Sequence, residues 1–329
     1  TDYQALRNSP IPCKIQLGKE LTAGHGAGNN PAMGEKSAQE SLADIEAILK
    51  KDTRMAFITA AMGGGTGTGA APVIAKLSKD MGILTVGIVS VPARFEGPKR
   101  LDQARDGLRR LKDHVDCLIV IDNEKIKSIY GSQTISQAFA KANDVLNIAA
   151  KGIAEIITLP GYINVDFADV RTVMTDSGVA IMGAAQASGE DRAIRAITEA
   201  LESPLLNNND ILGAKDILLN ITSGTDEITM DEMSQITSHI IRKVGNNAAV
   251  IWGVGTDPDL DAISVTIIAT GFPTGDIELF GEENTCAGYA KQPECLKEEE
   301  VRVKPGLTEE QVRELETVPA FERRDLRVS

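Results

Sequence analysis

The sequence is short of the features that mark secreted and membrane-spanning proteins. Its four cysteines are scattered through 329 residues, with no close pair of the kind that holds zinc or builds a disulfide framework, so we expect reduced thiols. No apolar run reaches the roughly 18 residues that a membrane span needs. The first residues also lack the basic and then apolar pattern of a secretory signal. These absences predict a cytoplasmic protein.

Positive charge is also in deficit. Lys and Arg total 34 against 47 Asp and Glu, which gives a net charge of -13. Such a surface repels a phosphate backbone, so a nucleic-acid-coating function is excluded. With 42% hydrophobic and 25% charged residues, the composition is that of a globular protein, and the length suits about two domains.

From Met55 onward, short β-branched runs alternate with helical patterns. Apolar runs at 55–60, 83–91 and 117–121 are separated by helical patterns that start at Ala70 and Pro98. This alternation is typical of βαβ units around a parallel sheet. The first part of the chain is therefore predicted to be an α/β, Rossmann-like domain.

A long helical pattern follows, from Ile135 to Leu159, and Pro160-Gly161 stops it. After it come strand-like runs and helical patterns that predict a smaller α+β domain. The strand-like runs are 178–185, 216–222, 248–254 and 262–270, and the helical patterns are 191–201 and 230–244. The predicted divisions are residues 1–134, a central helix at 135–160 and the smaller domain at 161–272.

Beyond Phe272 the periodicity ends. Residues 273–314 are rich in Pro, Gly and charge, which is the composition of a linker. Residues 315–329 turn partly apolar again, with Val318-Pro319-Ala320-Phe321 followed by two arginines. A short apolar and basic segment after a linker predicts a peptide that docks on a partner. A frayed tail with incidental Val and Phe is the alternative.

A glycine-rich run lies between the strand that ends at Ala60 and the helix expected at Ala70. Backbone N–H groups without neighbouring Cβ atoms can close on phosphate oxygens there, and the helix N-terminus adds its positive dipole end. The Walker A lysine is missing, and so is the acidic residue of a dinucleotide site. The run therefore predicts a nucleotide phosphate site, with hydroxyl donors from two threonines, and a flexible glycine linker is disfavoured. It comprises Gly63, Gly64, Gly65, Thr66, Gly67, Thr68 and Gly69.

GGGTGTG followed by AAPVIA resembles the signature loop of the tubulin and FtsZ superfamily. From Thr1 to about Phe272 the chain is similar to the FtsZ branch, the bacterial cell-division GTPases, and Val318–Arg324 is similar to that branch's partner-binding peptide. The resemblance implies a tubulin/FtsZ-like fold that binds GTP or GDP with Mg²⁺ and polymerises head to tail at the mid-cell division site. It also implies division and membrane-tethering partners for the tail, so that the chain meets the membrane only indirectly.

The resemblance assigns two phosphate and sugar loops. The segment Gly24–Pro31 resembles the loop near the γ-phosphate, although by itself it reads only as a cluster of turn residues. Glu96 and Arg100 resemble the residues of the sugar loop, where they would contact ribose or phosphate; otherwise they form a solvated i,i+4 pair. Within the first loop the expected contacts are Gly26, Ala27, Gly28 and Asn29.

The same resemblance assigns the base contacts. Asn123 follows a strand, at the carboxyl end where open α/β sheets bind ligands, and its amide can read the guanine edge. Asp144, with Asn143 beside it, would accept from the guanine N–H groups. Phe139 either stacks on the base or is a core aromatic.

Two carboxylates follow the central helix. Asn164 can cap a new helix, which would put Asp166 and Asp169 on one face. Such a pair can hold a metal or orient a water, or it is simply a solvated helix start. The resemblance implies the loop that enters the nucleotide pocket of the neighbouring subunit. Hydrolysis would then need a head-to-tail contact between subunits. The catalytic residues would be Asn164, Asp166 and Asp169.

The chain departs from the family at its beginning. The family has an opening strand, another glycine-rich loop, a helix and a second strand before the point that corresponds to Thr1, so we expect an incomplete GTPase domain. A degenerate, non-hydrolysing scaffold that recruits partners through its tail is the alternative. A nicotinamide-dependent dehydrogenase is disfavoured, because the acidic ribose anchor and a catalytic His are both missing.

Overall fold

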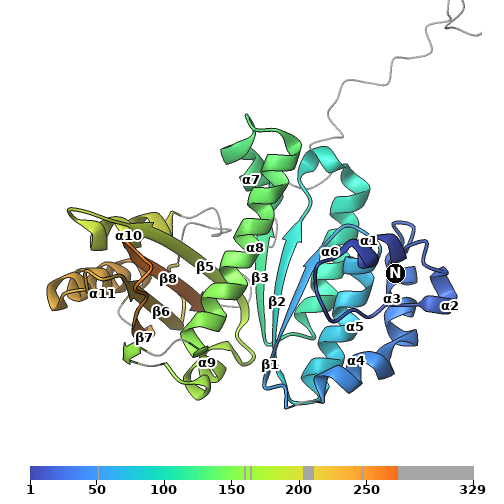
Figure 1. The fold of residues 1–329 in the computed structure, drawn as a ribbon, viewed down its shortest axis with the longest axis horizontal. Helices are drawn as coiled ribbons and strands as arrows, with labels where there is room; N and C mark the ends of the chain where they lie inside the picture. Colours follow the sequence, from blue (N-terminus) through green and yellow to red (C-terminus); the bar gives the residue numbers. More distant parts are fainter. Residues whose placement is uncertain (51, 159–160, 164, 203–210, 246–247, 273–329) are drawn as a thin grey trace, which may run out of the picture. The chain divides into compact units, whose positions relative to one another are not determined.

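The computed structural model describes residues 1–50, 52–158, 161–163, 165–202, 211–245 and 248–272, so the predicted linker and tail lie outside it. Among these residues one eight-stranded sheet runs through the molecule in the order β1-β2-β3-β5-β8-β6-β7-β4 (Figure 1). The strands are β1 (Met55–Ala61), β2 (Leu84–Val91), β3 (Cys117–Asp122), β4 (Gly161–Ile163), β5 (Gly178–Ala187), β6 (Asp216–Ser223), β7 (Ala249–Thr256) and β8 (Ile263–Thr270). Every strand predicted from the sequence is present.

The first part of the sheet is parallel. β1 pairs with β2 and β2 with β3, as the alternation of strand and helix predicts. Every residue of β2 is buried, because helices cover both faces of this part (Figure 1). The helices of the first 130 residues are α1 (Tyr3–Asn8), α2 (Lys19–Thr22), α3 (Pro31–Glu40), α4 (Leu42–Leu49), α5 (Thr66–Asp80), α6 (Pro98–Lys112) and α7 (Asn123–Tyr130), with the 3₁₀ turn η1 at Arg94–Glu96.

Strand β5 joins the two parts of the sheet. Its first residues, Gly178–Ala180, pair in parallel with β3, and Ile181–Ala187 pair antiparallel with β8. Beyond β8 the sheet is mixed, since β6 is antiparallel to β8 and parallel to β7, and β4 is antiparallel to β7. One strand therefore carries the backbone hydrogen bonding from the parallel part into the mixed part.

The mixed part has a hydrophobic core on each face. α10 (Arg192–Leu201) and α11 (Met230–Val244) cover one face, where Leu219 of β6 is buried. α8 (Ile135–Thr158) and α9 (Phe167–Met174) cover the other, where the neighbouring Leu218 is buried. Adjacent residues of a strand point to opposite faces, so β6 contributes to both cores.

Helix α8 is the long central helix that the sequence predicts. Its 24 residues extend roughly 36 Å at 1.5 Å per residue. Val145, Ala149 and Ile153 lie on its buried face, in the same core as residues from both parts of the sheet. Within the described residues no helix is long and apolar enough to cross a membrane.

Candidate nucleotide site

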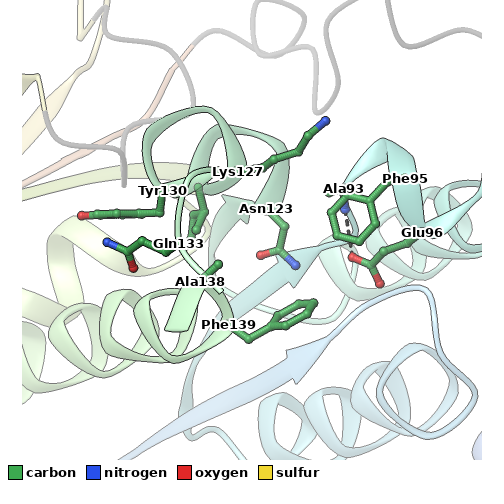
Figure 2. Close-up of a pocket in the computed structure, with 11 residues that line it drawn as sticks. Ala93, Phe95, Glu96, Asn123, Lys127, Tyr130, Gln133, Ala138 and Phe139 are labelled. Carbon is green, nitrogen blue, oxygen red and sulfur yellow. Dashed lines mark hydrogen bonds between the residues drawn. The ribbon is translucent and has the colours of Figure 1, made fainter. Parts of the chain in front are cut away.

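A cavity of about 300 Å³ opens where β2 and β3 end. Its lining comes from η1, α7 and the start of α8, which lie at the carboxyl ends of the parallel strands. Figure 2 shows Asn123 and Phe139 facing one space, with Phe95 and Glu96 across from them. This is the edge at which open α/β sheets bind ligands.

Asn123 is held at the base of the cavity by the start of α7. Asp122 caps this helix, because its Oδ1 accepts from Glu124 N at 2.8 Å. Asn123 Oδ1 is buried and has no hydrogen-bond partner among the described residues. A buried oxygen without a donor costs about 1–3 kcal/mol, so a ligand that supplies a donor there gains this amount. Burial raises the pKa of Asp122, although the hydrogen bond from Glu124 N and the charge of Lys125 act against this.

Phe139 lines the cavity and is 42% exposed, so the alternative of a core aromatic is wrong. Asn143 and Asp144 follow on the same helix and are exposed. Neither is among the residues that line the cavity. The structure therefore brings Phe139 and Asn123 together and leaves the expected acidic base contact further along α8.

Glu96 is part of the cavity wall and of an ion pair. Its Oε1 accepts from Ala93 N at 3.0 Å, and its Oε2 lies 2.9 Å from Arg100 Nη1. The expected i,i+4 pair is therefore present, and the role of Glu96 and Arg100 as sugar contacts stays a prediction. The turn is also tied to α7, since Arg94 N donates to Glu124 Oε2 at 2.8 Å.

The glycine-rich run forms both the turn after β1 and the first turn of α5. The helix begins at Thr66 and not at Ala70, which corrects the predicted start. Close packing explains this: a Cβ on Gly67 would overlap Ala61 O, and one on Gly69 would overlap Pro31 O. These contacts outweigh the low helix propensity of glycine.

The first N–H groups of α5 have no side-chain cap, and Gly65 occupies the cap position. Around Gly64 a Cβ would meet nothing within 4 Å, so this part of the turn is open. Thr68 is buried, and its Oγ1 accepts from Gly63 N at 2.9 Å, which shapes the turn. Thr66 Oγ1 lies 2.6 Å from Thr1 Oγ1.

The loop 24–30 packs directly on this run. A Cβ on Gly65 would come within 2.8 Å of both Ala27 Cβ and Asn30 N. The loop needs left-handed backbone at Gly26, Gly28 and Asn29, with φ of 86°, 58° and 55°. Two segments that are far apart in the sequence, 24–30 and 63–69, are thus brought together as the resemblance implied.

One residue that sequence reasoning missed also reaches this loop. Gln103 of α6 donates from Nε2 to Asn29 O at 3.2 Å. It lies one turn after Arg100 and one turn before Gly107, on the face of α6 that meets the glycine-rich run. The i,i+3 and i,i+4 spacing of these three residues was the sequence signal that could have identified Gln103.

Asp166 and Asp169 form a capping box at the start of α9. Asp166 Oδ1 accepts from Asp169 N at 2.9 Å, and Asp169 Oδ2 accepts from Asp166 N at 3.2 Å. The cap is therefore Asp166, and the expected cap at Asn164 is wrong; Asn164 itself lies outside the described residues.

α9, which begins at the two carboxylates, and α7, which lines the cavity, lie at opposite ends of α8 (Figure 1). From Phe139 to Thr158 the helix alone extends about 29 Å. One chain therefore does not bring the expected catalytic residues to its own cavity. In the part of the chain that the structure describes, no group of three or more His, Cys, Asp or Glu is placed to hold a metal.

Comparisons with known proteins show the family of the chain. Residues 1–131 match the Tubulin/FtsZ family, GTPase domain, and residues 178–273 match the FtsZ family, C-terminal domain. Cell division protein FtsZ of Porphyromonas gingivalis is 48% identical over 275 residues, which are 83% of this chain and 60% of that protein. The FtsZ of Coxiella burnetii is 47% identical over 273 residues, 82% of this chain and 70% of that protein.

Solved structures show the same fold. The empty FtsZ dimer of M. jannaschii superposes with a TM-score of 0.77 at 43% identity, covering 82% of this chain and 78% of that one. CetZ2 of Haloferax volcanii, described as a GTPγS-bound protofilament, gives a TM-score of 0.69 at 20% identity over 84% and 83% of the two chains. The second likeness concerns the fold alone.

Proposed function

The chain belongs to the FtsZ family of cell-division proteins, and from this premise we propose that it binds and hydrolyses GTP and polymerises head to tail in the bacterial division ring. It spans about 60% of the length of the Porphyromonas gingivalis relative. The observation that carries the proposal is the cavity beside Asn123 and Phe139, and the uncapped start of α5 supports it.

Each part of GTP has a proposed position. Asn123, Phe139, Asn143 and Asp144 bind the base, with Phe139 stacked on it. Glu96 accepts from the ribose hydroxyls and Arg100 donates to ribose or phosphate, because a carboxylate has lone pairs beyond its bonds to Ala93 N and Arg100. Residues 63–69 and 26–29 surround the phosphates, whose oxygens accept from the free N–H groups at the start of α5.

Hydrolysis requires a second copy of the chain. Asp166 and Asp169 lie beyond the far end of α8 from the cavity, so in a head-to-tail stack they orient the attacking water on the nucleotide of the next subunit. Mg²⁺ suits this site, because it is typically held by one or two carboxylates together with phosphate oxygens and waters. When bound, it would neutralise phosphate charge.

The proposal extends to the whole chain. Residues 1–134 form the GTPase domain, 135–160 the central helix and 161–272 the C-terminal domain. The segment Val318–Arg324, outside the described residues, binds division and membrane-tethering proteins at mid-cell. A peptide with this sequence should then compete for those partners.

The test is phosphate release by variants of the two carboxylates. Asp166→Ala combined with Asp169→Ala should bind GTP normally and lose turnover by at least about 100-fold, as expected when groups that position the nucleophile are removed. Asp166→Asn is the matched control for folding. Asn is about as good an N-cap residue as Asp, so this variant keeps the start of α9 and removes the charge. Its turnover should still fall.

The dependence of the rate on concentration completes the test. The wild-type rate per molecule should rise with protein concentration, because each active site needs two subunits. Normal turnover in the double variant would contradict the assignment. Assembly without phosphate release at any concentration would favour the non-hydrolysing scaffold instead.

A further inference from the structure

Gln103 bridges α6 and the loop 24–30. Its Nε2 donates to Asn29 O at 3.2 Å across 74 residues of sequence. Asn29 has a left-handed backbone with φ of 55°, and the next residue, Asn30, caps α3 by accepting from Ala32 N at 3.0 Å. The hydrogen bond from Gln103 thus reaches the residue that turns the loop into α3.

The face of α6 that carries Gln103 packs on the glycine-rich run. A Cβ on Gly63 would lie 2.8 Å from Arg100 O, and one on Gly107 would lie 2.5 Å from Thr68 Cγ2. Positions 100, 103 and 107 share a helix face. Gln103 is therefore the residue of this face that bonds the loop 24–30, and this loop in turn meets the glycine-rich run at Ala27 and Gly65.

The other end of the same amide has no donor. Gln103 Oε1 is buried, with no hydrogen-bond partner among the described residues. Both this oxygen and a phosphate oxygen are acceptors, and one water can donate to two acceptors at once. A nucleotide with a water on its outermost phosphate would supply the missing donor.

We infer that Gln103 is a positioning residue that holds the loop 24–30 against the glycine-rich run and makes affinity depend on the number of phosphates of the bound nucleotide. The inference rests on the proposed binding of a guanine nucleotide here. It adds a residue to that site and a reason why GTP and GDP bind with different affinity. The amide of Gln103 fixes the loop with Nε2, and its Oε1 contacts the terminal phosphate through a water.

The experiment compares three variants of the full chain by titration with GTP and with GDP. Gln103→Leu keeps the size and removes both hydrogen bonds, and Gln103→Glu keeps the acceptor but cannot donate to Asn29 O. Lys112→Gln, on the opposite face of the same helix, is the control. Hydrogen exchange of the amides of residues 24–30 is measured without nucleotide.

Gln103→Leu should lower GTP affinity about tenfold and GDP affinity less than twofold, the size expected for loss of one neutral hydrogen bond. Gln103→Glu should lower GTP affinity at least as much, because it adds negative charge near phosphates. Amides of residues 24–30 should exchange about fivefold faster in both variants. The control should match the wild type throughout.

Equal losses of GTP and GDP affinity would show a merely structural role and overturn the inference, as would unchanged affinities. Failure of the wild-type chain to bind either nucleotide would overturn the proposed function and, with it, the discrimination by Gln103. Unchanged exchange in residues 24–30 would overturn the positioning role, whatever the nucleotide result.

Discussion

Two helices of the parallel part and two of the mixed part begin in different ways. α5 and α6, which follow β1 and β2, have Gly65 and Gly97 at the cap position and no side-chain cap, whereas α7 in the same part is capped by Asp122. In the mixed part, α9 and α11 begin with capping boxes that satisfy their own first N–H groups. Free N–H groups at a helix start favour an external anion, and capped ones do not. The start of α5 therefore suits an external anion.

Two sets of buried polar groups also differ in their hydrogen bonding. In the mixed part, buried Arg192 donates to Glu232 Oε1 at 2.7 Å and to the carbonyls of Asp226 and Glu227. These bonds fix the segment before α11 and its first turn, so the charges there serve the fold. In the parallel part, by contrast, Asn123 Oδ1 in the cavity wall and Gln103 Oε1 of α6 are buried and have no partner among the described residues.

The largest expected effect tests the structural role of charge in the mixed part. Arg192→Ala should lower the free energy of unfolding by about 3 kcal/mol, because it leaves partly buried carboxylates without their partner. Urea unfolding measures this loss. Arg195→Ala, an exposed residue that donates to Ser188 O, is the control and should cost less than about 0.5 kcal/mol. A fall of GTP affinity in Arg192→Ala would break the division between the two parts.

Acid should remove the same interaction. The hydrogen bond from Arg192 lowers the pKa of Glu232 to about 2, although burial opposes it. Because the folded-state pKa is depressed, the stabilisation is present above the ordinary value of 4.5 and is lost as pH falls toward 2. Glu232→Gln should therefore be about 2 kcal/mol less stable than wild type at pH 7, with the difference shrinking below pH 4.5. Parallel urea curves at pH 7 and pH 3 with a constant difference would contradict this.

A methyl group at Gly64 should separate ligand binding from folding. Space around Gly64 is open and its φ is not positive, so Gly64→Ala should change the free energy of unfolding by less than about 1 kcal/mol. If phosphates lie against this turn, GTP affinity should fall at least about tenfold by titration. Gly255→Ala, with Thr222 Oγ1 3.9 Å from the new Cβ, is the control in the mixed part. Unchanged GTP affinity in Gly64→Ala would contradict the proposed position of the phosphates against this turn.

The smallest expected effect is the loss of GTP affinity when a proposed contact with the guanine base is removed. Asn123→Ala should lower GTP affinity about fivefold, because one neutral hydrogen bond to the base is lost. It should not destabilise the free chain, since Asn123 Oδ1 has no partner to lose there. Titration and thermal unfolding are compared with Asn147→Ala, an exposed position on α8. Lower stability with unchanged affinity would show that Asn123 serves only the fold.

The central strands β2 and β3 could be predicted because they are buried on both faces. Runs such as Ile88 and its neighbours in β2 are continuously apolar, which no exposed segment would be. Helix α3 was missed for the opposite reason. It packs through the small residues Gly34, Ser37 and Ala38, which give no apolar period. The start of α5 was missed because close approach to Pro31 O, a tertiary contact, requires Gly69 inside a helix.

The site divides in a similar way. The glycine-rich run was evident from its place between strand and helix, whereas Glu96 and Phe139 gained a role only from the resemblance. Gln103 was missed because its partner is 74 residues away and its type carries no motif. Local spacing predicts loops, but contacts between loops depend on the finished packing.

Helix α8 also sets a length scale. It is one unbroken rod between the end that lines the cavity and the end that precedes the carboxylates of α9. In the proposed head-to-tail stack, the axial repeat between successive nucleotides would then depend on the number of residues in this rod. One added turn would lengthen each repeat by about 5.4 Å while leaving both ends chemically intact. Such a subunit could not share a filament with the original one without strain at every junction.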